Sequence, residues 1–568
     1  MVGLFLPITM EEVQRRKWNK LDIIFVTGDA YIDHPSFGVA LLGRLLESKG
    51  YKVGIIAQPV SVEDIKRLGR PNLFFGVTSG SVDSMVANYT ASKKKRKSDD
   101  YTPGGINNRR PDRAVIQYVN MIKQAFKDVP IVVGGIEASL RRFAHYDWWS
   151  DKVRKSILVD SKADILVYGM GEHAVLEIAK RIETGKNLDG ILGTVIWKSE
   201  LDKLDESFEI VEIPPFEEVS QSKDAYNEMY KKIIHLTDPM KKIKIVQKQD
   251  TRYVIQYPPS MPLSSKELDE LYLLPYERRV HPFYENLGRV KAIETVRFSI
   301  TAVRGCFGNC SFCAITHHQG THVTFRSEES ILEEVKILTK MPDFRGTIVD
   351  VGGPTANMYG YTCTIREKNG QCLKSCMFPK VCKSIGREDS AIKFINLLQK
   401  IKSLPKVNHV FVGSGIRHDL ILSSPDAQYI IENLVDYTSG QLKLAPEHAH
   451  PNVLKLMHKP SIELFLEFKK RFEEASRRKG QEKYVIGYFI VGHPGEGEKE
   501  NLYLMEFVKK HLGYIPQQVQ IFTPTPGTLS TTMYYTQKDP FTGEKIFVIK
   551  DEKTREKFKQ RIIFQRRD

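Results

Sequence analysis

Apolar and polar residues alternate in blocks along the first part of the chain. Apolar runs end in turns that contain Gly, and helical patterns follow at 38–48, 112–127 and 173–183. Apolar runs of this length are typical of parallel strands buried between helices. The predicted strands lie at 21–28, 52–59, 73–80, 131–139 and 163–172. We therefore predict an α/β fold with a doubly wound parallel sheet, which binds ligands beyond the carboxyl ends of its strands.

The second part of the chain repeats a strand–helix unit six times. The predicted strands lie near 295–303, 346–352, 408–413, 440–445, 484–491 and 517–523. The predicted helices lie near 327–340, 389–402, 425–436, 460–478 and 497–511. Six such units with right-handed crossovers favour a partial (β/α)6 barrel, with its chemistry at the carboxyl ends of the strands. An insertion at 354–387 interrupts the repeat after its second strand.

These patterns predict three parts of the chain. Residues 1–285 form an N-terminal α/β domain, in which 184–285 are an elaboration and a linker. Residues 286–550 form the barrel with its insertion, and 551–568 form a basic C-terminal tail.

Composition narrows the class of protein. Among 568 residues, 41% are hydrophobic and 27% charged, which excludes collagen-like and wholly disordered chains. No uncharged apolar run approaches the roughly 20 residues that span a bilayer, and the N-terminus lacks the pattern of a signal peptide. We expect a cytoplasmic protein with no membrane partner. The net charge of +15 is compatible with a nucleic-acid partner or with a basic solvated surface.

The cysteines form the clearest chemical pattern. All seven lie between Cys306 and Cys382, whereas disulfide frameworks spread through small secreted domains. Three of them stand within eight residues, at Cys306, Cys310 and Cys313. Three thiolates can hold three corners of a [4Fe–4S] cluster and leave one iron open. An open iron can chelate S-adenosylmethionine, whose carbon–sulfur bond one electron then breaks.

Two other interpretations of this cysteine trio stay open at this point. Zinc could take the same thiolates together with His317 or His318. The thiols could also be buried without a metal, as small hydrophobic groups.

The segment CFGNCSFC (306–313), with aromatic Phe312, resembles the cluster signature of the radical SAM superfamily. VGGP (351–354) resembles the family element whose backbone meets the methionyl amino group, which implies contacts from Gly352 and Gly353. Proline stands there in place of the usual acid, which leaves the side-chain contacts of that element open.

Later segments extend the resemblance and imply further contacts with S-adenosylmethionine. GSGIRHD (413–419) is similar to the segment whose polar side chains reach the ribose or the carboxylate, which implicates Ser414 and Arg417. Glu447 stands at a position that is usually a polar contact, and the backbone near Val491 resembles the segment that brackets adenine.

The whole chain resembles the YgiQ-like family of radical SAM proteins, through 134–158, 281–320 and the cysteines of the insertion. The resemblance implies an enzyme that generates a 5′-deoxyadenosyl radical and needs an electron donor such as flavodoxin or ferredoxin. Its substrate stays open, and RNA or tRNA is one alternative. From another class, the chain could be a zinc-stabilised nucleic-acid-binding protein without catalysis.

The insertion carries the other four cysteines: Cys363, Cys372, Cys376 and Cys382. Four thiolates suit an auxiliary iron–sulfur cluster or a structural zinc ion, and the thiols could also be unliganded. Because the insertion follows the second strand, we expect this group near the mouth of the barrel.

The N-terminal half resembles a cobalamin-binding domain. The base-off signature requires Asp-x-His-x-x-Gly, whereas Asp33-His34 and Gly38 have the right letters at the wrong spacing. We therefore regard His34 as an improbable cobalt ligand and cobalamin as an improbable but not excluded cofactor.

Overall fold

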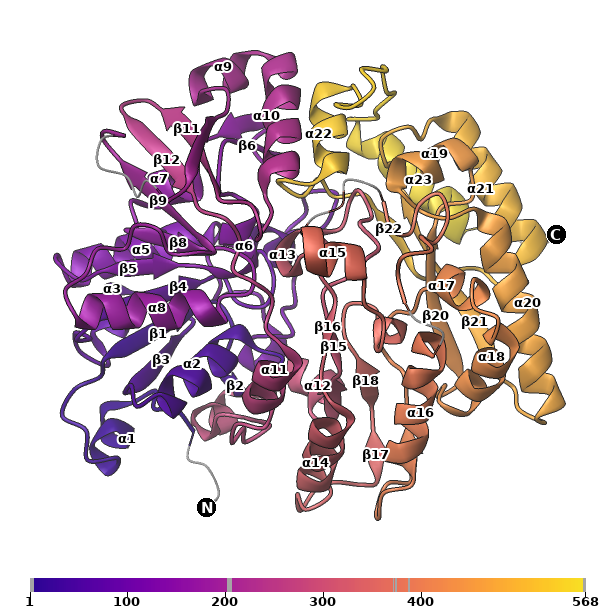
Figure 1. Ribbon diagram of the computed structural model, residues 1–568, viewed down its shortest axis with the longest axis horizontal. Coiled ribbons are helices and arrows are strands. Elements are labelled where there is room, and N and C mark those ends of the chain that lie inside the picture. Colours follow the sequence, from indigo (N-terminus) through magenta and orange to yellow (C-terminus); the bar gives the residue numbers. More distant parts are fainter. Residues whose placement is uncertain (1–4, 202–206, 371, 373–374, 387–388, 565–568) are drawn as a thin grey trace. The chain divides into compact units, whose positions relative to one another are not determined.

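The computed structural model describes residues 5–201, 207–370, 372, 375–386 and 389–564. The chain divides into two compact units: unit 1 comprises 1–262 and 270–297, and unit 2 comprises 263–269 and 298–568. In Figure 1, unit 1 runs mainly from indigo to magenta and unit 2 from salmon to yellow.

The centre of unit 1 is a five-stranded parallel part of a sheet, in the spatial order β3-β1-β4-β5-β8. The strands are β1 (Ile23–Thr27), β3 (Val53–Ala57), β4 (Phe74–Thr78), β5 (Ile131–Val133) and β8 (Ile165–Val167). Each coincides with a predicted strand, although the last two are shorter than expected. The chain passes from β1 to β3 on one side and returns to β4 on the other, so the topological switch point lies between β1 and β4.

Residues that we expected to be an elaboration and a linker extend the same sheet. Strands β9 (Thr194–Lys198), β12 (Arg252–Gln256), β11 (Ile243–Gln249) and β10 (Glu209–Glu212) follow β8 in that order. Antiparallel pairing joins β8 to β9, β9 to β12 and β12 to β11. Val254 and Ile255 are fully buried, so these strands contribute to the core.

Helices cover the sheet of unit 1. The amphipathic helix α2 buries Val39, Ala40 and Leu46 in the same apolar cluster as Ile23, and Ala174 of α8 joins it. The longer helices are α2 (Gly38–Ser48), α5 (Ala114–Ala125), α8 (Glu172–Glu183) and α10 (Lys223–Leu236). The shorter helices are α1 (Met10–Arg15), α3 (Val62–Lys66), α4 (Ser84–Asn88), α6 (Gly135–Ser139), α7 (Ile157–Ser161), α9 (Phe216–Gln221) and α12 (Ala292–Val296).

Unit 2 contains the repeated strand–helix units. Its main strands are β14 (Ser299–Thr301), β17 (Thr347–Ile348), β18 (Asp350–Gly352), β19 (His409–Val410), β20 (Gln441–Glu447), β21 (Tyr484–Val491) and β22 (Val519–Ile521). Parallel pairing joins β14 to β18, β17 to β19, β20 to β21 and β21 to β22. The strands follow chain order, as in a partial (β/α)6 barrel.

The predicted helices of unit 2 all form. They are α14 (Glu328–Leu338), α16 (Ser390–Lys402), α18 (Ala427–Asp436), α20 (Ile462–Arg478) and α21 (Glu498–His511). In α20, the side chains of Phe465, Phe468 and Phe472 follow helical spacing and are fully buried. Figure 1 shows α20 and α21 as long helices beside β20 and β21.

The segment that we expected to be a basic tail, 551–568, contains helix α23 (Glu552–Ile563). Asp551 caps the helix, and Phe558 and Ile562 are fully buried at a spacing of four residues. The helix packs against β22 and α21. The two buried apolar side chains of α23 therefore make this helix part of unit 2, although most of its other residues are charged. Residues 565–568 lie outside the described residues.

In the part of the chain that the structure describes, no helix combines the length and apolar character needed to cross a bilayer.

Candidate functional site

The three closely spaced cysteines follow the first barrel strand. Strand β15 (Val303–Arg304) leads into Gly305, whose φ of 77° favours glycine. A Cβ at Gly305 would lie only 1.9 Å from the carbonyl oxygen of His322. The loop can therefore turn tightly here only because this position carries no side chain. Helix α13 (Ala314–Gln319) begins directly after Cys313.

Each of the three sulfur atoms accepts a hydrogen bond. The amide of Gly308 donates to Cys306 Sγ at 3.3 Å. The amide of Thr316 donates to Cys313 Sγ at 3.5 Å, and Arg417 Nη1 donates to Cys310 Sγ at 3.6 Å. Hydrogen bonds to thiolate sulfurs tune iron–sulfur clusters, so these donors suit cluster ligands.

The Cys306 and Cys310 sulfurs lie on either side of Gly308, and Cys313 is close enough to feel the charges of both. A Cβ at Gly308 would lie 3.1 Å from Cys306 Sγ and 3.8 Å from Cys310 Sγ. Burial, first, and then the neighbouring Cys310 raise the pKa of Cys313, and the pKa of Cys306 is raised chiefly by burial. Metal binding would therefore displace protons from thiols that are otherwise neutral.

The trio suits a cluster better than one ion. Among the described residues, no three Cys, His, Asp or Glu side chains are grouped to hold a single metal ion, and this covers the trio with His317 or His318. One zinc ion holds its sulfurs at about 2.3 Å from a common centre, whereas a [4Fe–4S] cluster binds them through separate irons. The donors that surround the trio fit the cluster.

The predicted glycine pair ends β18 at close approaches to neighbouring segments. A Cβ at Gly352 would lie 2.4 Å from Ser414 Oγ, and one at Gly353 would lie 2.1 Å from the carbonyl oxygen of Val303. Neither position has space for a side chain, so only glycine fits at the end of this strand.

The Ser414 hydroxyl is bonded within the protein. It donates to Asp350 Oδ2, and the amides of Gly413 and Ser414 donate to Asp350 Oδ1 at 2.8 and 2.9 Å. Burial raises the pKa of Asp350, although these hydrogen bonds oppose the shift. Sequence reasoning missed Asp350, and its position two residues before the glycine pair was the available signal. The predicted contact of Ser414 with S-adenosylmethionine stays a prediction.

Arg417 lies beside the cysteine trio. Its Nε and Nη2 donate to Asp419 at 2.8 and 2.6 Å, and both side chains are buried. The side-chain oxygen of Asn357 accepts a hydrogen bond from the Arg417 amide, and its Nδ2 donates to the Arg417 carbonyl. Sequence reasoning singled out Arg417 as a ligand contact but missed Asp419, which holds the guanidinium in position.

Glu447 adopts an unusual backbone conformation at the end of β20. Its φ is 70°, and the register of β20 with β21 shifts between Leu444 and Glu447. A residue other than glycine with positive φ stores strain, which gathers at functional sites. Burial raises the pKa of Glu447, whereas the charges of Lys459 and Arg417 lower it. The carboxyl group therefore lies within electrostatic reach of Arg417.

A buried polar chain links the ends of later segments to the cysteine loop. His493 Nε2 lies 2.7 Å from Ser530 Oγ, which lies 2.8 Å from Ser311 Oγ. The ring of Phe312 meets His493 edge-on at 6.1 Å between centroids. Sequence reasoning did not single out His493, whose signal was its place two residues after the end of β21. The predicted adenine contact, Val491, is fully buried, and its carbonyl accepts from Phe522.

The insertion brings its cysteines to the first group. Cys363, Cys376 and Cys382 share an apolar cluster with Cys306. Cys363 and Cys376 thus pack beside Cys306, and the expected place of the group near the mouth of the barrel stays a prediction. Cys372 belongs to the same group by its electrostatic effect on Cys376.

In unit 1, His34 is not free to ligate a metal. Its Nδ1 accepts from the amide of Ser36 at 3.1 Å, and its Nε2 lies 3.1 Å from Arg278 Nη1. The ring is buried, and burial followed by the Arg278 charge lowers its pKa well below the ordinary value.

The switch point of unit 1 is filled by the chain itself. Asp29, directly after β1, pairs with Arg110 at 2.9 Å and accepts two hydrogen bonds from Ser81 at 2.7 Å. Arg110 also pairs with Asp99 at 3.2 Å, and its side chain is fully buried. A Cβ at Gly28 would lie 2.1 Å from the Ser79 carbonyl oxygen. These contacts close the crevice between the ends of β1 and β4.

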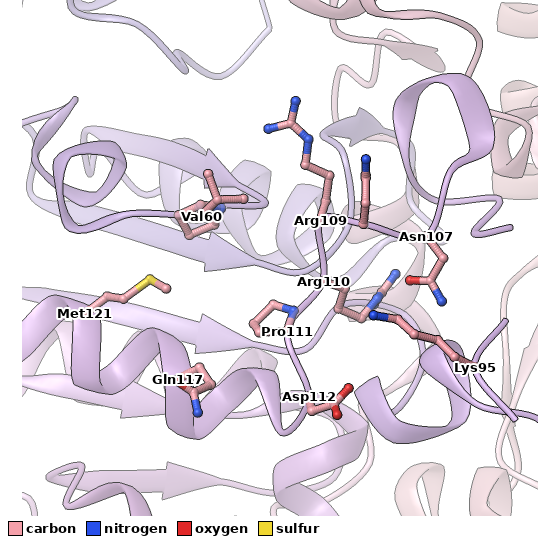
Figure 2. A pocket seen from close by; sticks show the side chains of 11 residues that line it. Val60, Lys95, Asn107, Arg109, Arg110, Pro111, Asp112, Gln117 and Met121 are labelled. Carbon is pink, nitrogen blue, oxygen red and sulfur yellow. The ribbon is translucent and has the colours of Figure 1, made fainter. Parts of the chain in front are cut away.

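A pocket of about 410 Å³ opens beside this network (Figure 2). Its lining includes Lys95, Arg109 and Asp112, and Asp112 accepts hydrogen bonds from Asn88 and Tyr89. Figure 2 shows Arg109 and Arg110 extending in different directions from adjacent positions, so the charges of the lining do not converge on one point.

Comparison with protein families accounts for most of the chain. The model described as "Radical SAM N-terminal" matches residues 5–299, and the model described as "Radical SAM superfamily" matches 300–508. A domain of unknown function (DUF3362) matches 517–568. The chain is thus a radical SAM enzyme, as the sequence resemblance predicted.

Close relatives define the family further. A UPF0313 protein of Thermotoga neapolitana is 63% identical, over 99% of each chain. A UPF0313 protein of Clostridium botulinum is 48% identical, over 99% of this chain and 87% of that one. This protein belongs to the UPF0313 family.

One solved structure supports the α/β fold. The radical S-adenosylmethionine methyltransferase TsrM from Kitasatospora setae, with cobalamin and a [4Fe–4S] cluster bound, has a TM-score of 0.51 and 14% identity. The match covers 90% of this chain and 74% of that one. The likeness concerns the fold alone.

Proposed function

We propose that Cys306, Cys310 and Cys313 hold a [4Fe–4S] cluster, whose open iron binds S-adenosylmethionine. The observation that carries this proposal is a hydrogen-bond donor at each of the three sulfurs, two of which, Cys306 Sγ and Cys310 Sγ, lie together beside Gly308. When reduced by a donor such as flavodoxin or ferredoxin, the bound cluster supplies the electron that cleaves S-adenosylmethionine to methionine and a 5′-deoxyadenosyl radical, which takes a hydrogen atom from the substrate.

The residues of the chain have three tasks in this proposal. Arg417, held by Asp419, balances the negative charge of the thiolates. Gly352 and Gly353 let the end of β18 pack closely against Ser414 and the Val303 carbonyl, and the backbone held there would bind the amino group of the ligand. Apolar neighbours such as Phe307 exclude water from the cluster.

Electron paramagnetic resonance tests the binding of S-adenosylmethionine. We expect the anaerobically reconstituted and reduced protein to give a [4Fe–4S]⁺ signal that shifts when S-adenosylmethionine is added, and we expect air to bleach the cluster. The Cys310→Ala variant should lose that signal. A signal that is identical with and without saturating S-adenosylmethionine would contradict coordination at the cluster.

We further propose that the reaction proceeds without a corrinoid. His34 uses both ring nitrogens within unit 1, and Arg110 fills the switch point with its pairing to Asp29. We expect cobalamin incubated with the reconstituted protein to keep its free spectrum and to elute separately in gel filtration. Co-elution at one equivalent per chain would overturn this part of the proposal.

A further inference from the structure

The insertion folds its cysteines against the first cysteine group. Cys363 and Cys376 are buried, at 6% and 4% exposure, in one apolar cluster with Cys306 and Phe307. Cys382 packs against the same cluster. Residues of both cysteine groups therefore pack in the same apolar cluster within unit 2.

Three cysteines of the insertion, Cys363, Cys376 and Cys382, pack in one apolar cluster, and Cys372 acts electrostatically on Cys376. Burial raises the pKa of Cys376, and the thiols of Cys363, Cys382 and Cys372 raise it further, as expected for charges at short range. The amide of Cys382 donates to the Cys376 carbonyl at 2.8 Å. Cysteines that are up to nineteen positions apart in sequence thus meet around Cys376.

The backbone closes the loop that carries them. Cys363 forms an antiparallel bridge with Ile385, and the amide of Gly386 donates to the Thr362 carbonyl at 2.8 Å. Cys363 also precedes helix α15 (Thr364–Asn369) as its N-terminal cap residue. These backbone contacts hold the two ends of the cysteine segment next to each other. A site with ligands from both ends requires this arrangement.

A buried cation stands between the two cysteine groups. Arg366 is 4% exposed, its Nη1 donates to the Thr321 carbonyl at 2.6 Å, and its guanidinium lies 5.7 Å from the centre of the Phe307 ring. Its Nε is buried and has no hydrogen-bond partner among the described residues. An unsatisfied buried donor is costly, and the positive charge of Arg366 acts on Cys376. Both observations call for an anionic group beside Arg366.

A cluster and a single ion make different demands on the four thiols. Among the described residues, the insertion cysteines form no group placed around a single metal ion. The same holds for Cys306, Cys310 and Cys313, the trio that carries the signature of the superfamily. A cluster accepts more widely spaced sulfurs than zinc, because each sulfur binds its own iron.

We propose that Cys363, Cys372, Cys376 and Cys382 bind a second iron–sulfur cluster, next to the first, with Arg366 compensating its negative charge. Four thiolates complete the ligand set of such a cluster. This second cluster has no open iron, so it binds no S-adenosylmethionine, and the proposal stands independently of the proposed function.

The test uses full-length protein without the first site. The triple variant Cys306→Ala, Cys310→Ala and Cys313→Ala is reconstituted anaerobically with iron and sulfide. We expect it to retain iron and acid-labile sulfide in equal amounts, about two or four of each per chain, with cluster absorption in the visible range. Adding Cys376→Ala to this variant should remove both. A triple variant that is free of iron, or that holds one zinc ion instead, would overturn the proposal.

A second variant keeps the first site and removes the second, which tests the proposal even if the triple variant does not fold. Cys372→Ser with Cys376→Ser should keep about four irons and the signal that responds to S-adenosylmethionine, while it loses the second cluster. Equal iron contents in this variant and in the wild type would count against the second cluster. Arg366→Gln, which keeps a neutral donor at this position, should speed the loss of iron to a chelator several-fold in the triple variant that lacks the first site.

Discussion

The chemistry of this molecule depends on a few buried charges beside sulfur atoms. Burial alone would raise the pKa of Asp419, but the paired Arg417 lowers it below the ordinary value of 3.8. The stability that Asp419 contributes is therefore complete above that value and is lost as the pH falls through the lower pKa of the folded state. At neutral pH, the pair stays charged and holds Arg417 on the Cys310 sulfur.

Removing Arg417 tests this positioning role. We expect Arg417→Met to lower the free energy of unfolding by about 3–5 kcal/mol, because it leaves Asp419 charged and unpaired in the interior. Chemical denaturation of the apoprotein measures this effect. Arg417→Met combined with Asp419→Leu should recover much of the lost stability but should still shift the reduction potential of the reconstituted cluster. An unchanged potential in the double variant would show that Arg417 is only structural.

At this scale, the sequence points to the cysteines but not to the residues that contact them. The spacing of Cys306, Cys310 and Cys313 is local, so it is visible in the sequence. Asp419 and Asp350 act through partners whose positions depend on the folded barrel, and Glu447 shows its strain only in its backbone angle. Contacts of this kind require the fold before they can be recognised.

Elements deliver the cysteines to the site through tight turns. Gly305 links β15 to the cysteine loop at a positive φ, in contact with the His322 carbonyl. Gly320, at the end of α13, also has a positive φ but lies in open space. Both glycines have a positive φ, but only Gly305 has a neighbouring atom in the place of a Cβ. Comparing the two therefore separates the effect of backbone strain from the effect of a steric clash.

Alanine at these two glycines should have different effects. Gly320→Ala adds only the strain of a φ of 87° with a ψ of 174°, about 1–3 kcal/mol. Gly305→Ala must also displace the His322 carbonyl, so we expect a larger loss of stability than for Gly320→Ala, together with less iron per chain after reconstitution. Iron content together with thermal denaturation measures both. Equal iron contents in the two variants would contradict the steric argument.

Helix α23 is an element that the sequence pattern understated. Its charged residues suggested a tail, whereas Phe558 and Ile562 form a narrow apolar stripe that packs on β22 and α21. By contrast, the helices of the barrel were predicted nearly to their ends, because their apolar periods are long and regular. The strand predicted at 295–303 begins inside α12 and is shorter as β14, and the strand predicted at 408–413 is shorter as β19. The added strands β9–β12 escaped prediction because they mix charged and apolar residues.

Truncating the stripe of α23 tests whether it stabilises unit 2. Phe558→Ala should cost about 3–5 kcal/mol, because it opens a cavity in a fully buried position. Lys557→Ala, at an exposed neighbouring position, should change stability by less than about 0.5 kcal/mol. Urea-induced unfolding distinguishes the two, and equal midpoints would show that α23 does not contribute to the core.

At the scale of the whole molecule, buried neutral histidines make stability depend on pH. Burial lowers the pKa of His418 and of His493 to about 3. Between the ordinary value of 6.5 and 3, the unfolded chain binds protons that the folded chain does not, so stability falls as the pH falls.

The expected size of this effect can be measured. Well inside this window, each histidine should lower the free energy of unfolding by about 1.4 kcal/mol per pH unit. Urea unfolding at pH 6 and at pH 5 measures the slope. His493→Gln should reduce the slope by the share of one histidine, and a slope unchanged by this substitution would show that His493 titrates normally in the folded protein.

The central claim is that the trio of cysteines supports reductive cleavage of S-adenosylmethionine. The most direct measurement quantifies 5′-deoxyadenosine after anaerobic incubation of reconstituted protein with S-adenosylmethionine and dithionite. We predict its formation by the wild type and its loss in the Cys310→Ala variant. Equal product in both proteins, or none from wild-type protein that holds its full complement of iron, would contradict the account.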